Sequence, residues 1–231
     1  MRVLYVEDIE NTAAREWAEC LTKTMEREFD VVPADAFSPE MEADFLFFAT
    51  GNRSRRVQHW LNLSRELRVP YVFLTPQMHF PLNSSNSLNP STPILTSVLA
   101  PVTMLEEEVH KAELLSHLAR YTDASLTLLT AHDYGSRART NTDKIRTFLE
   151  TRQKDLGKQF VITEQTAKAD SLSLHKEVMS LRTADLIVWT ASRDYGLDDL
   201  IFGPAERKLI LHSAVPVVLL NPRGDLFSLC D

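Results

Sequence analysis

The sequence is poor in cysteine and has no long apolar run. Its two cysteines, Cys20 and Cys230, show neither the spacing of metal ligands nor a disulfide framework, so both are predicted to be free thiols. No stretch approaches the roughly 18 apolar residues that a membrane-spanning helix requires. Acidic residues appear early, at Glu7 and Asp8, directly after the first apolar run. We therefore expect a cytoplasmic protein with no membrane partner.

Positive charge is also scarce. The 25 lysine and arginine residues are outnumbered by 32 aspartate and glutamate residues, which gives a formal net charge of −7. This balance provides no global basic field, so we expect no nucleic-acid partner, and local arginine clusters are judged separately. With 44% hydrophobic and 25% charged residues, the chain of 231 residues has an ordinary globular composition. Its length allows one large domain or two small ones.

The chain does contain an internal repeat. Residues 43–76 and 184–222 follow one pattern: an Ala-Asp pair, a short apolar run, a loop, an amphipathic helix and a second apolar run that ends in proline. The closing runs are closely similar, Val69–Pro76 in the first copy and Val215–Pro222 in the second. Such a repeat indicates one small α/β unit that is present twice.

Short apolar runs alternate with amphipathic stretches along the whole chain. Strands are expected at residues 2–7, 29–32, 45–48, 69–76, 94–99, 126–129, 160–162, 186–189 and 215–222. Helices are expected at residues 14–25, 54–67, 105–119, 142–157 and 172–182 and from residue 204 onward. Continuous apolar strands joined by helical crossovers form parallel sheets that are covered on both faces. The sequence therefore predicts an α/β protein of the doubly wound, Rossmann-like class.

A polar stretch divides the chain. Residues 79–93 are rich in Pro, Asn and Ser and cannot bury enough apolar area to offset chain entropy, so they are predicted to be a linker. The predicted domains are a shortened unit over residues 1–78 and a full-length unit over residues 94–231.

Local signals in the longer unit make finer predictions. Thr103 and Glu106 predict a capping box at the start of a helix whose inner face begins with Leu105. The run Glu106–Glu108 is read as the acidic first turn of this helix. Gly157 is expected in the left-handed conformation that follows a helix.

The longer unit, about residues 93–223, resembles a universal stress protein domain. The resemblance rests on the stretch from Ala184-Asp185 and its apolar strand, through Gly203, to the strand Val215–Leu219. The whole chain is similar to the tandem form, in which two such domains share one polypeptide. The resemblance implies two Rossmann-like units of the adenine nucleotide alpha hydrolase type in tandem and a non-catalytic, regulatory role in stress response.

The resemblance also implies how the two units meet. In the family, the last strands of two domains commonly lie at a pseudo-twofold interface, which here brings Pro70–Leu74 towards Pro216–Leu220. One chain would then mimic a dimer. The first unit is too short for one strand and helix pair of the family, so it is similar to a shortened, degenerate copy. Further association into a homodimer and an unidentified protein partner are left open.

ATP-binding members of the family carry a Gly-x2-Gly-x9-Gly-Ser/Thr motif, because backbone amides must approach the phosphates closely. The matching positions here are Thr190, Arg193, Gly203 and Pro204, so only one of them keeps the residue of the motif. The acidic residue that the family places at the end of its first strand corresponds to Leu99 in this interpretation. The second unit is therefore not predicted to bind ATP in the usual way.

The first unit has a different set of residues that could bind a ligand. Asp8 matches the first-strand acid, and a glycine-bearing, arginine-rich segment lies at the predicted entry to the helix that follows residues 45–48. The candidate ligand residues are Asp8, Gly51, Asn52, Arg53, Ser54 and Arg56. Such a segment can hold a phosphate, or ATP or another adenine nucleotide, through amides and guanidinium groups. The alternative is that its arginines only solvate a loop and pair with nearby acids. Arg137 and Arg139 present the same two alternatives in the longer unit.

Other candidate sites have structural explanations that fit at least as well. The helical pair His110 and His117 resembles a charged helix face more than a metal site. His132 and Asp133 lie at a strand end but have no nucleophile beside them. Trp17 and Trp60 fall on apolar helical stripes and are predicted to be core residues.

Two further functional classes remain as alternatives. The opening strand with Glu7 and Asp8 is similar to that of a receiver domain, but Ala49 stands where the phosphate-accepting aspartate is needed, and no lysine occurs between Lys23 and Lys111. An adenylating or hydrolase-type enzyme of the same fold is supported by analogy of fold alone.

Overall fold

The computed structural model describes residues 2–80, 94–132, 135–169, 173–181, 183–192 and 204–221. Its strands are β1 (Arg2–Glu7), β2 (Glu28–Pro33), β3 (Phe45–Ala49), β4 (Tyr71–Leu74), β5 (Ser97–Val102), β6 (Ser125–Thr130), β7 (Ile162–Thr166), β8 (Leu186–Thr190) and β9 (Val217–Leu220). Its α-helices are α1 (Thr12–Thr24), α2 (Ser54–Ser64), α3 (Lys111–Thr122), α4 (Ser136–Leu156), α5 (Leu174–Ser180) and α7 (Ala205–His212), and the 3-10 helix η1 spans Glu106–His110.

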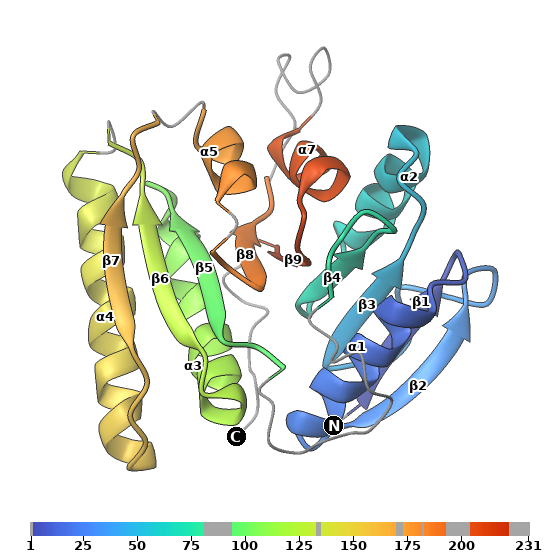
Figure 1. Ribbon diagram of the computed structural model, residues 1–231, viewed down its shortest axis with the longest axis horizontal. Coiled ribbons are helices and arrows are strands. Elements are labelled where there is room, and N and C mark those ends of the chain that lie inside the picture. The colour runs from blue at the N-terminus through green and yellow to red at the C-terminus, as the bar shows by residue number, and fades with distance from the viewer. Residues whose placement is uncertain are drawn as a thin grey trace.

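All strands join one nine-stranded sheet in the order β2-β1-β3-β4-β9-β8-β5-β6-β7 (Figure 1). Every neighbouring pair is parallel except β4 and β9, which pair antiparallel with Val72 opposite Val218. The closing strands of the repeat therefore meet, as the family resemblance implied. The α/β fold class with two Rossmann-like units is confirmed, and the first half of the sheet has one strand fewer than the second.

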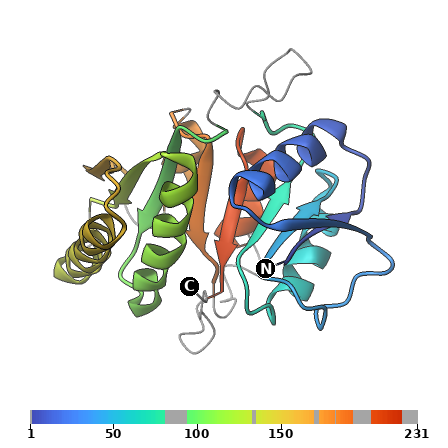
Figure 2. The ribbon, with the colours of Figure 1, turned by 90° about the horizontal axis from the view of Figure 1, so that it is seen from below.

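Helices cover both faces of the sheet. Helices α1, α3 and α4 lie on one face and α2, α5 and α7 on the other, as the two ribbon views show (Figures 1 and 2). Successive strand residues alternate between the two cores: the Phe47 side chain packs under α1, and the Phe48 side chain packs under α2. This two-sided burial explains the continuous apolar runs in the sequence.

The junction between the halves carries a buried polar contact. Asn221, which follows β9, donates through Nδ2 to the carbonyl oxygens of Ser64 (2.7 Å) and Leu67 (2.9 Å), just after α2. Its Oδ1 accepts a hydrogen bond from the Tyr71 hydroxyl at 2.9 Å. The end of the second unit thus satisfies the carbonyl groups that terminate a helix of the first.

Some local predictions succeed and others fail. Gly157 adopts the expected left-handed conformation, with φ of 62°. The prediction of a capping box formed by Thr103 and Glu106 is wrong, because the hydroxyl of Thr103 donates to Glu108 at 2.7 Å. Leu105 is 43% exposed and does not lie on an inner helix face. The chain forms η1 before α3, and this 3-10 turn rotates Glu108 into the interior.

The predicted domain limits stay predictions. Residues 81–93 of the expected linker and the second cysteine, Cys230, lie outside the described part of the chain. Cys20 is a free, half-buried thiol. Among the described residues, no helix is both long enough and apolar enough to span a membrane.

Candidate functional site

The candidate site of the first unit lies at the carboxyl end of β1 and β3. These strands are parallel neighbours, so their ends meet at one edge, where open α/β sheets bind ligands. The amide of Asp8 donates to the carbonyl oxygen of Ala49 at 3.0 Å, which fixes the acid at this edge. Because β4 and β9 are antiparallel, the corresponding edge of the second unit faces the opposite way.

The Asp8 carboxylate is buried and fully engaged. Its side chain is 3% exposed, and it pairs with the Arg56 guanidinium from the first turn of α2. Arg56 Nε lies 2.8 Å from both carboxylate oxygens, and the Thr50 hydroxyl donates to Oδ2 at 3.0 Å. The Arg56 guanidinium also lies 5.8 Å from the centre of the Trp60 ring. Asp8 and Arg56, both predicted ligand residues, are thus brought together, but they bind each other.

The surroundings of Asp8 have opposing effects on its acidity. Burial favours the neutral acid, but hydrogen bonds from Arg56, with help from Trp60 and Thr50, outweigh it and lower the pKa of Asp8 below its ordinary value. The Trp60 indole nitrogen is buried and makes no hydrogen bond of normal geometry among the described residues. Asp8 is therefore ionised at neutral pH.

The segment between Asp8 and Arg56 remains open to solvent. Asn52, Arg53, Ser54 and Arg55 are all exposed. Arg53 is the N-cap of α2 and makes no side-chain capping bond, so its side chain leaves the first amides of this helix uncapped. A Cβ on Gly51 would meet only Ile9 Cγ2, at 3.9 Å, so glycine is not required there for space.

The acid position of the second unit is not Leu99. In the sheet, Val3 pairs with Phe45, and Val98 pairs with Leu186, the residue that follows the same Ala-Asp pair in the repeat. Counting along both strands from these pairs makes Thr103 the equivalent of Asp8. Leu99 is instead a core residue in the middle of β5, 3% exposed. The sequence interpretation was wrong because it aligned the end of an apolar run, and β5 continues through Pro101 and Val102.

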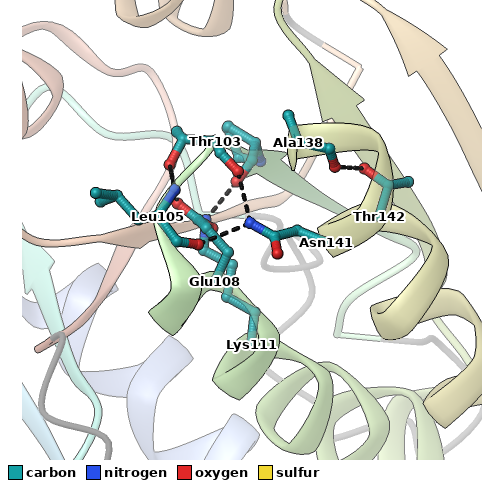
Figure 3. A network of polar contacts seen from close by, with 8 residues as sticks. Thr103, Leu105, Glu108, Lys111, Ala138, Asn141 and Thr142 are labelled. Atoms are coloured by element: carbon teal, nitrogen blue, oxygen red, sulfur yellow. Dashed lines mark hydrogen bonds and ion pairs between the residues drawn. The ribbon is translucent and has the colours of Figure 1, made fainter. Parts of the chain in front are cut away.

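Thr103 belongs to a buried polar network, shown in Figure 3. Its hydroxyl donates to Glu108, which forms an ion pair with Lys111 Nζ at 2.5 Å. Lys111 Nζ also donates to the carbonyl oxygen of Pro101. Glu108 and Lys111 side chains are each 1% exposed, and burial lowers the pKa of Lys111 although Glu108 opposes this. Asn141 Nδ2 donates to the carbonyl oxygens of Thr103 and Leu105.

The phosphate-loop positions of the second unit are only partly described. Arg193 and Gly203 lie outside the described residues, whereas Thr190 ends β8 and Pro204 is the N-cap of α7. The loop residue Ser192 donates its amide to Glu206 Oε1 at 3.2 Å and its hydroxyl to Oε2 at 3.1 Å.

Glu206, in the first turn of α7, is 1% exposed. Sequence reasoning missed it, although an acidic residue in the first turn after a helix-starting proline is the signal that would have found it.

The remaining candidates do not assemble into a site. Arg137 lies 3.8 Å from Glu106, with both side chains largely exposed, and Arg139 is also exposed. His110 lies in η1 and His117 in α3, and the described residues contain no cluster suited to a metal ion. His132 is exposed, and Asp133 lies outside the described chain.

Trp17 and Trp60 are core residues, as predicted. They are 0% and 2% exposed, respectively.

Comparisons with known proteins bear on the fold. No protein-family model and no curated protein sequence matches this chain. A universal stress protein from Archaeoglobus fulgidus DSM 4304 has a similar structure, with a TM-score of 0.55 and 14% identity over 97% of this chain and 88% of that one.

Other similar structures cover about half of this chain. A universal stress protein in complex with cAMP matches 57% of this chain and 100% of its own, with 15% identity and a TM-score of 0.43. UspA from Lactobacillus plantarum matches 55% of this chain and 97% of its own, with 15% identity and a TM-score of 0.35. The similarity to the Archaeoglobus fulgidus structure shows that the chain has the fold of the universal stress proteins.

Proposed function

We propose that this chain is a non-catalytic regulatory module of the universal stress protein type, which acts in stress response through binding. One observation carries the proposal. At the positions where ATP-binding members of this fold hold the nucleotide, the polar groups are bound by side chains of the chain itself. Asp8 is bound by Arg56, and Ser192 is bound by Glu206.

The contact between Glu206 and Ser192 supports the absence of standard ATP binding. A phosphate approaching the loop after β8 would have to displace a carboxylate that accepts both the amide and the hydroxyl of Ser192. Two anions at this place would repel each other in a region of low dielectric. Pro204 also removes a backbone N–H from the entry to α7.

ATP turnover and thermal unfolding test this proposal. With about 1 mM ATP and magnesium, we expect phosphate release at the rate of the buffer blank and no stabilisation that depends on the second unit. Glu206→Gln is the matched variant, because it keeps the size of the side chain and removes its charge. Turnover by the wild type that changes in Glu206→Gln, or a saturable ATP-induced shift that survives Arg53→Ala, would overturn the proposal.

A second candidate function is an anion or nucleotide sensor in the first unit. It is favoured by the exposed segment at the start of α2, where uncapped amides lie beside Arg53 and Arg55. No carboxylate of the described residues lies within ion-pair distance of these two arginines. Helix amides and guanidinium groups together suit a phosphate.

Thermal-shift titrations with ATP, ADP, AMP, cyclic nucleotides and inorganic phosphate test the sensor. Its signature is a shift with one ligand that is abolished in Arg53→Ala and kept in Arg68→Ala. Arg68 is also an exposed arginine, and it follows the same helix at its other end. If none of these ligands raises the midpoint, the sensor is excluded and the first proposal, a non-catalytic regulatory module, stands alone.

A further inference from the structure

The outer edge of β7 is open to a further strand. In the part of the chain that the structure describes, β7 is the last strand of the sheet on its side, and β6 is its one neighbour. Figure 1 shows β7 at the left end of the sheet. An edge of this kind presents backbone N–H and C=O groups that another extended chain can bind.

The pairing with β6 shows which backbone groups of β7 point outward. The Val161 carbonyl oxygen accepts from the Leu126 amide at 2.8 Å. The Ala167 amide donates to the Thr130 carbonyl oxygen at 2.7 Å. Residues 161 and 167 therefore direct their backbone groups towards β6, and in a parallel ladder every second residue does the same. The residues between them direct their N–H and C=O groups outward, namely Ile162, Glu164 and Thr166.

The opposite edge of the sheet, β2, is protected in a way that β7 is not. The Ala34 amide, just after β2, donates to the Glu7 carbonyl oxygen at 3.1 Å, so by the same alternation Pro33 faces outward. Proline has no N–H to offer a further strand. The sequence of β7, Ile-Thr-Glu-Gln-Thr, contains neither proline nor lysine, which are residues that commonly block an edge.

The two faces beside this edge differ. Glu164 pairs with Arg146 of α4 at 2.9 Å, so the side chains of even-numbered β7 residues lie on the α4 face. On the other face, Val161, Thr163 and Gln165 are exposed, Val161 to 63%. Figure 1 shows no helix of the described chain in front of this part of β7. Because β-branched side chains pack well on such a pleated surface, a strand added here should carry them on this face.

The α4 face of the edge carries an excess of negative charge. Arg146 lies 2.9 Å from Glu164, and it also lies 3.1 Å from Asp143 and 3.8 Å from Glu150. One cation thus faces three carboxylates, and all four side chains are in contact with solvent. A basic side chain on this face of an added strand would be attracted to the carboxylates that Arg146 leaves uncompensated.

A second copy of β7 is a poor occupant of this edge. In antiparallel pairing of two copies, the register that uses all three outward-facing residues places the two Glu164 side chains directly opposite each other. Like charges at facing positions destabilise a strand pair. The charge of the edge therefore favours a partner with basic residues where β7 has Glu164.

We infer that the edge of β7 binds an extended segment of a protein partner, in which β-branched residues alternate with basic residues. The backbone of the segment pairs with Ile162, Glu164 and Thr166, and its basic side chains lie beside the acids around Arg146. In strand addition, main-chain hydrogen bonds give affinity and alternate side chains give specificity. This surface supplies the binding through which the proposed regulatory module acts, so the inference rests on that proposed function.

Fluorescence anisotropy with a labelled peptide, Lys-Val-Lys-Val-Lys-Val-Lys, tests the inference. The wild type is expected to bind it with a Kd on the order of 100 µM. Glu164→Lys is expected to weaken binding at least about fivefold, because it replaces an attraction by a repulsion. Glu16→Lys is the control, since Glu16 is an exposed acid of the distant α1 and its replacement changes the net charge equally. No binding up to about 1 mM peptide, or equal weakening in the two variants, would overturn the inference.

Two further measurements test the backbone pairing. Thr166→Pro removes one outward N–H that the pairing with β6 does not use, so it should weaken peptide binding at least about fivefold and leave the circular dichroism spectrum unchanged. In the wild type, the peptide should slow amide hydrogen exchange at Ile162, Glu164 and Thr166. Binding that leaves exchange at these amides unchanged would contradict strand addition, whether or not the proline variant folds. Neither ATP turnover nor nucleotide titration enters these measurements, so their failure is distinguishable from failure of the proposed function.

Discussion

At the scale of single residues, the pair of Asp8 and Arg56 shows how a ligand-type residue can become structural. The acid stands at the carboxyl ends of β1 and β3, the edge at which open α/β sheets bind ligands. Its oxygens, however, are bound by Arg56 and Thr50. Burial of a carboxylate is tolerated only with such partners. Its ionised state therefore contributes to the stability of the fold.

Asp8→Asn should lower the free energy of unfolding by about 1–2 kcal/mol at pH 7, because it removes the charge opposite Arg56 and leaves Thr50 a weaker acceptor. Urea denaturation measures the change. Asp30→Asn is the control, since Asp30 lies 2.6 Å from Arg2 but both side chains are about half exposed. That exposed pair should contribute less than about 0.5 kcal/mol. Equal losses in the two variants would contradict the role of burial.

The difference in stability between the wild type and Asp8→Asn should depend on pH. The folded pKa of Asp8 lies below its ordinary value, so its stabilisation is complete above that value and is lost as the pH falls through it towards the folded pKa. The difference between the wild type and Asp8→Asn should accordingly shrink below about pH 4. A difference that stays constant down to pH 3 would show that the charge of Asp8 is not involved.

His117 is a buried base that the fold keeps neutral, whereas Asp8 is a buried acid that the fold keeps charged. Burial, with Arg27 and Arg120 nearby, lowers the pKa of His117 to about 4. The unfolded chain therefore takes up a proton at higher pH than the folded protein, and stability falls as the pH drops from about 6.5 towards 4. His117→Phe keeps a ring against Tyr121 and cannot titrate. Between pH 7.5 and pH 5, urea denaturation should show the wild type losing about 2 kcal/mol more than this variant. Equal losses of stability in the wild type and in His117→Phe would contradict a lowered pKa of His117.

At the scale of elements, short-range patterns predicted the strands and most helices well. Two bounds differ: α4 begins at Ser136 and not near residue 142, and β7 spans Ile162–Thr166 and not residues 160–162. The largest difference is in the segment after β5, where the acidic run Glu106–Glu108 suggested the first turn of one long helix. The chain instead forms η1 and buries Glu108 against Lys111. Local sequence could not reveal this, because the polar partners Thr103 and Asn141 come from separate elements and set which face of the turn is internal.

Asn221 links two elements that are far apart in sequence. Its amide binds carbonyl groups at the end of α2, and its oxygen accepts from Tyr71. Asn221→Ala should lower the free energy of unfolding by about 2–4 kcal/mol, because three buried polar groups lose their partner. Asn62→Ala is the control, since the exposed Asn62 only accepts from Gln58 one turn earlier in α2. Chemical denaturation measures the free energy of unfolding of both variants. A loss below about 1 kcal/mol in Asn221→Ala would contradict the linking role of Asn221.

At the scale of the whole molecule, the two units share one sheet and both cores. Each hydrophobic cluster contains residues from both halves, such as Phe47 with Leu128 on one face and Phe73 with Leu209 on the other. The antiparallel pairing of β4 and β9 joins the halves at the centre of the sheet. Neither unit has a separate core of its own.

The molecule should therefore unfold in one transition. In Trp189→Phe, tryptophan fluorescence reports only on Trp17 and Trp60 in the first unit, whereas circular dichroism reports on the whole chain. The two urea midpoints should coincide. A fluorescence midpoint clearly below that of circular dichroism would show that the first unit unfolds by itself.

The sequence by itself determined the parallel strands and the repeat. These two features depend on apolar runs and on a repeated order of elements, both of which are local or periodic. The meeting of the closing strands was an expectation that the resemblance to the universal stress proteins implied, and the pairing of β4 with β9 agrees with it. Only the tertiary structure decided which partners the charged groups bind. Arg56 pairs with Asp8, Glu206 accepts hydrogen bonds from Ser192, and Glu108 pairs with Lys111. Two of these contacts join separate elements and the third depends on which way η1 turns, so strand register and helix rotation fix their geometry, and no short stretch of sequence contains that information.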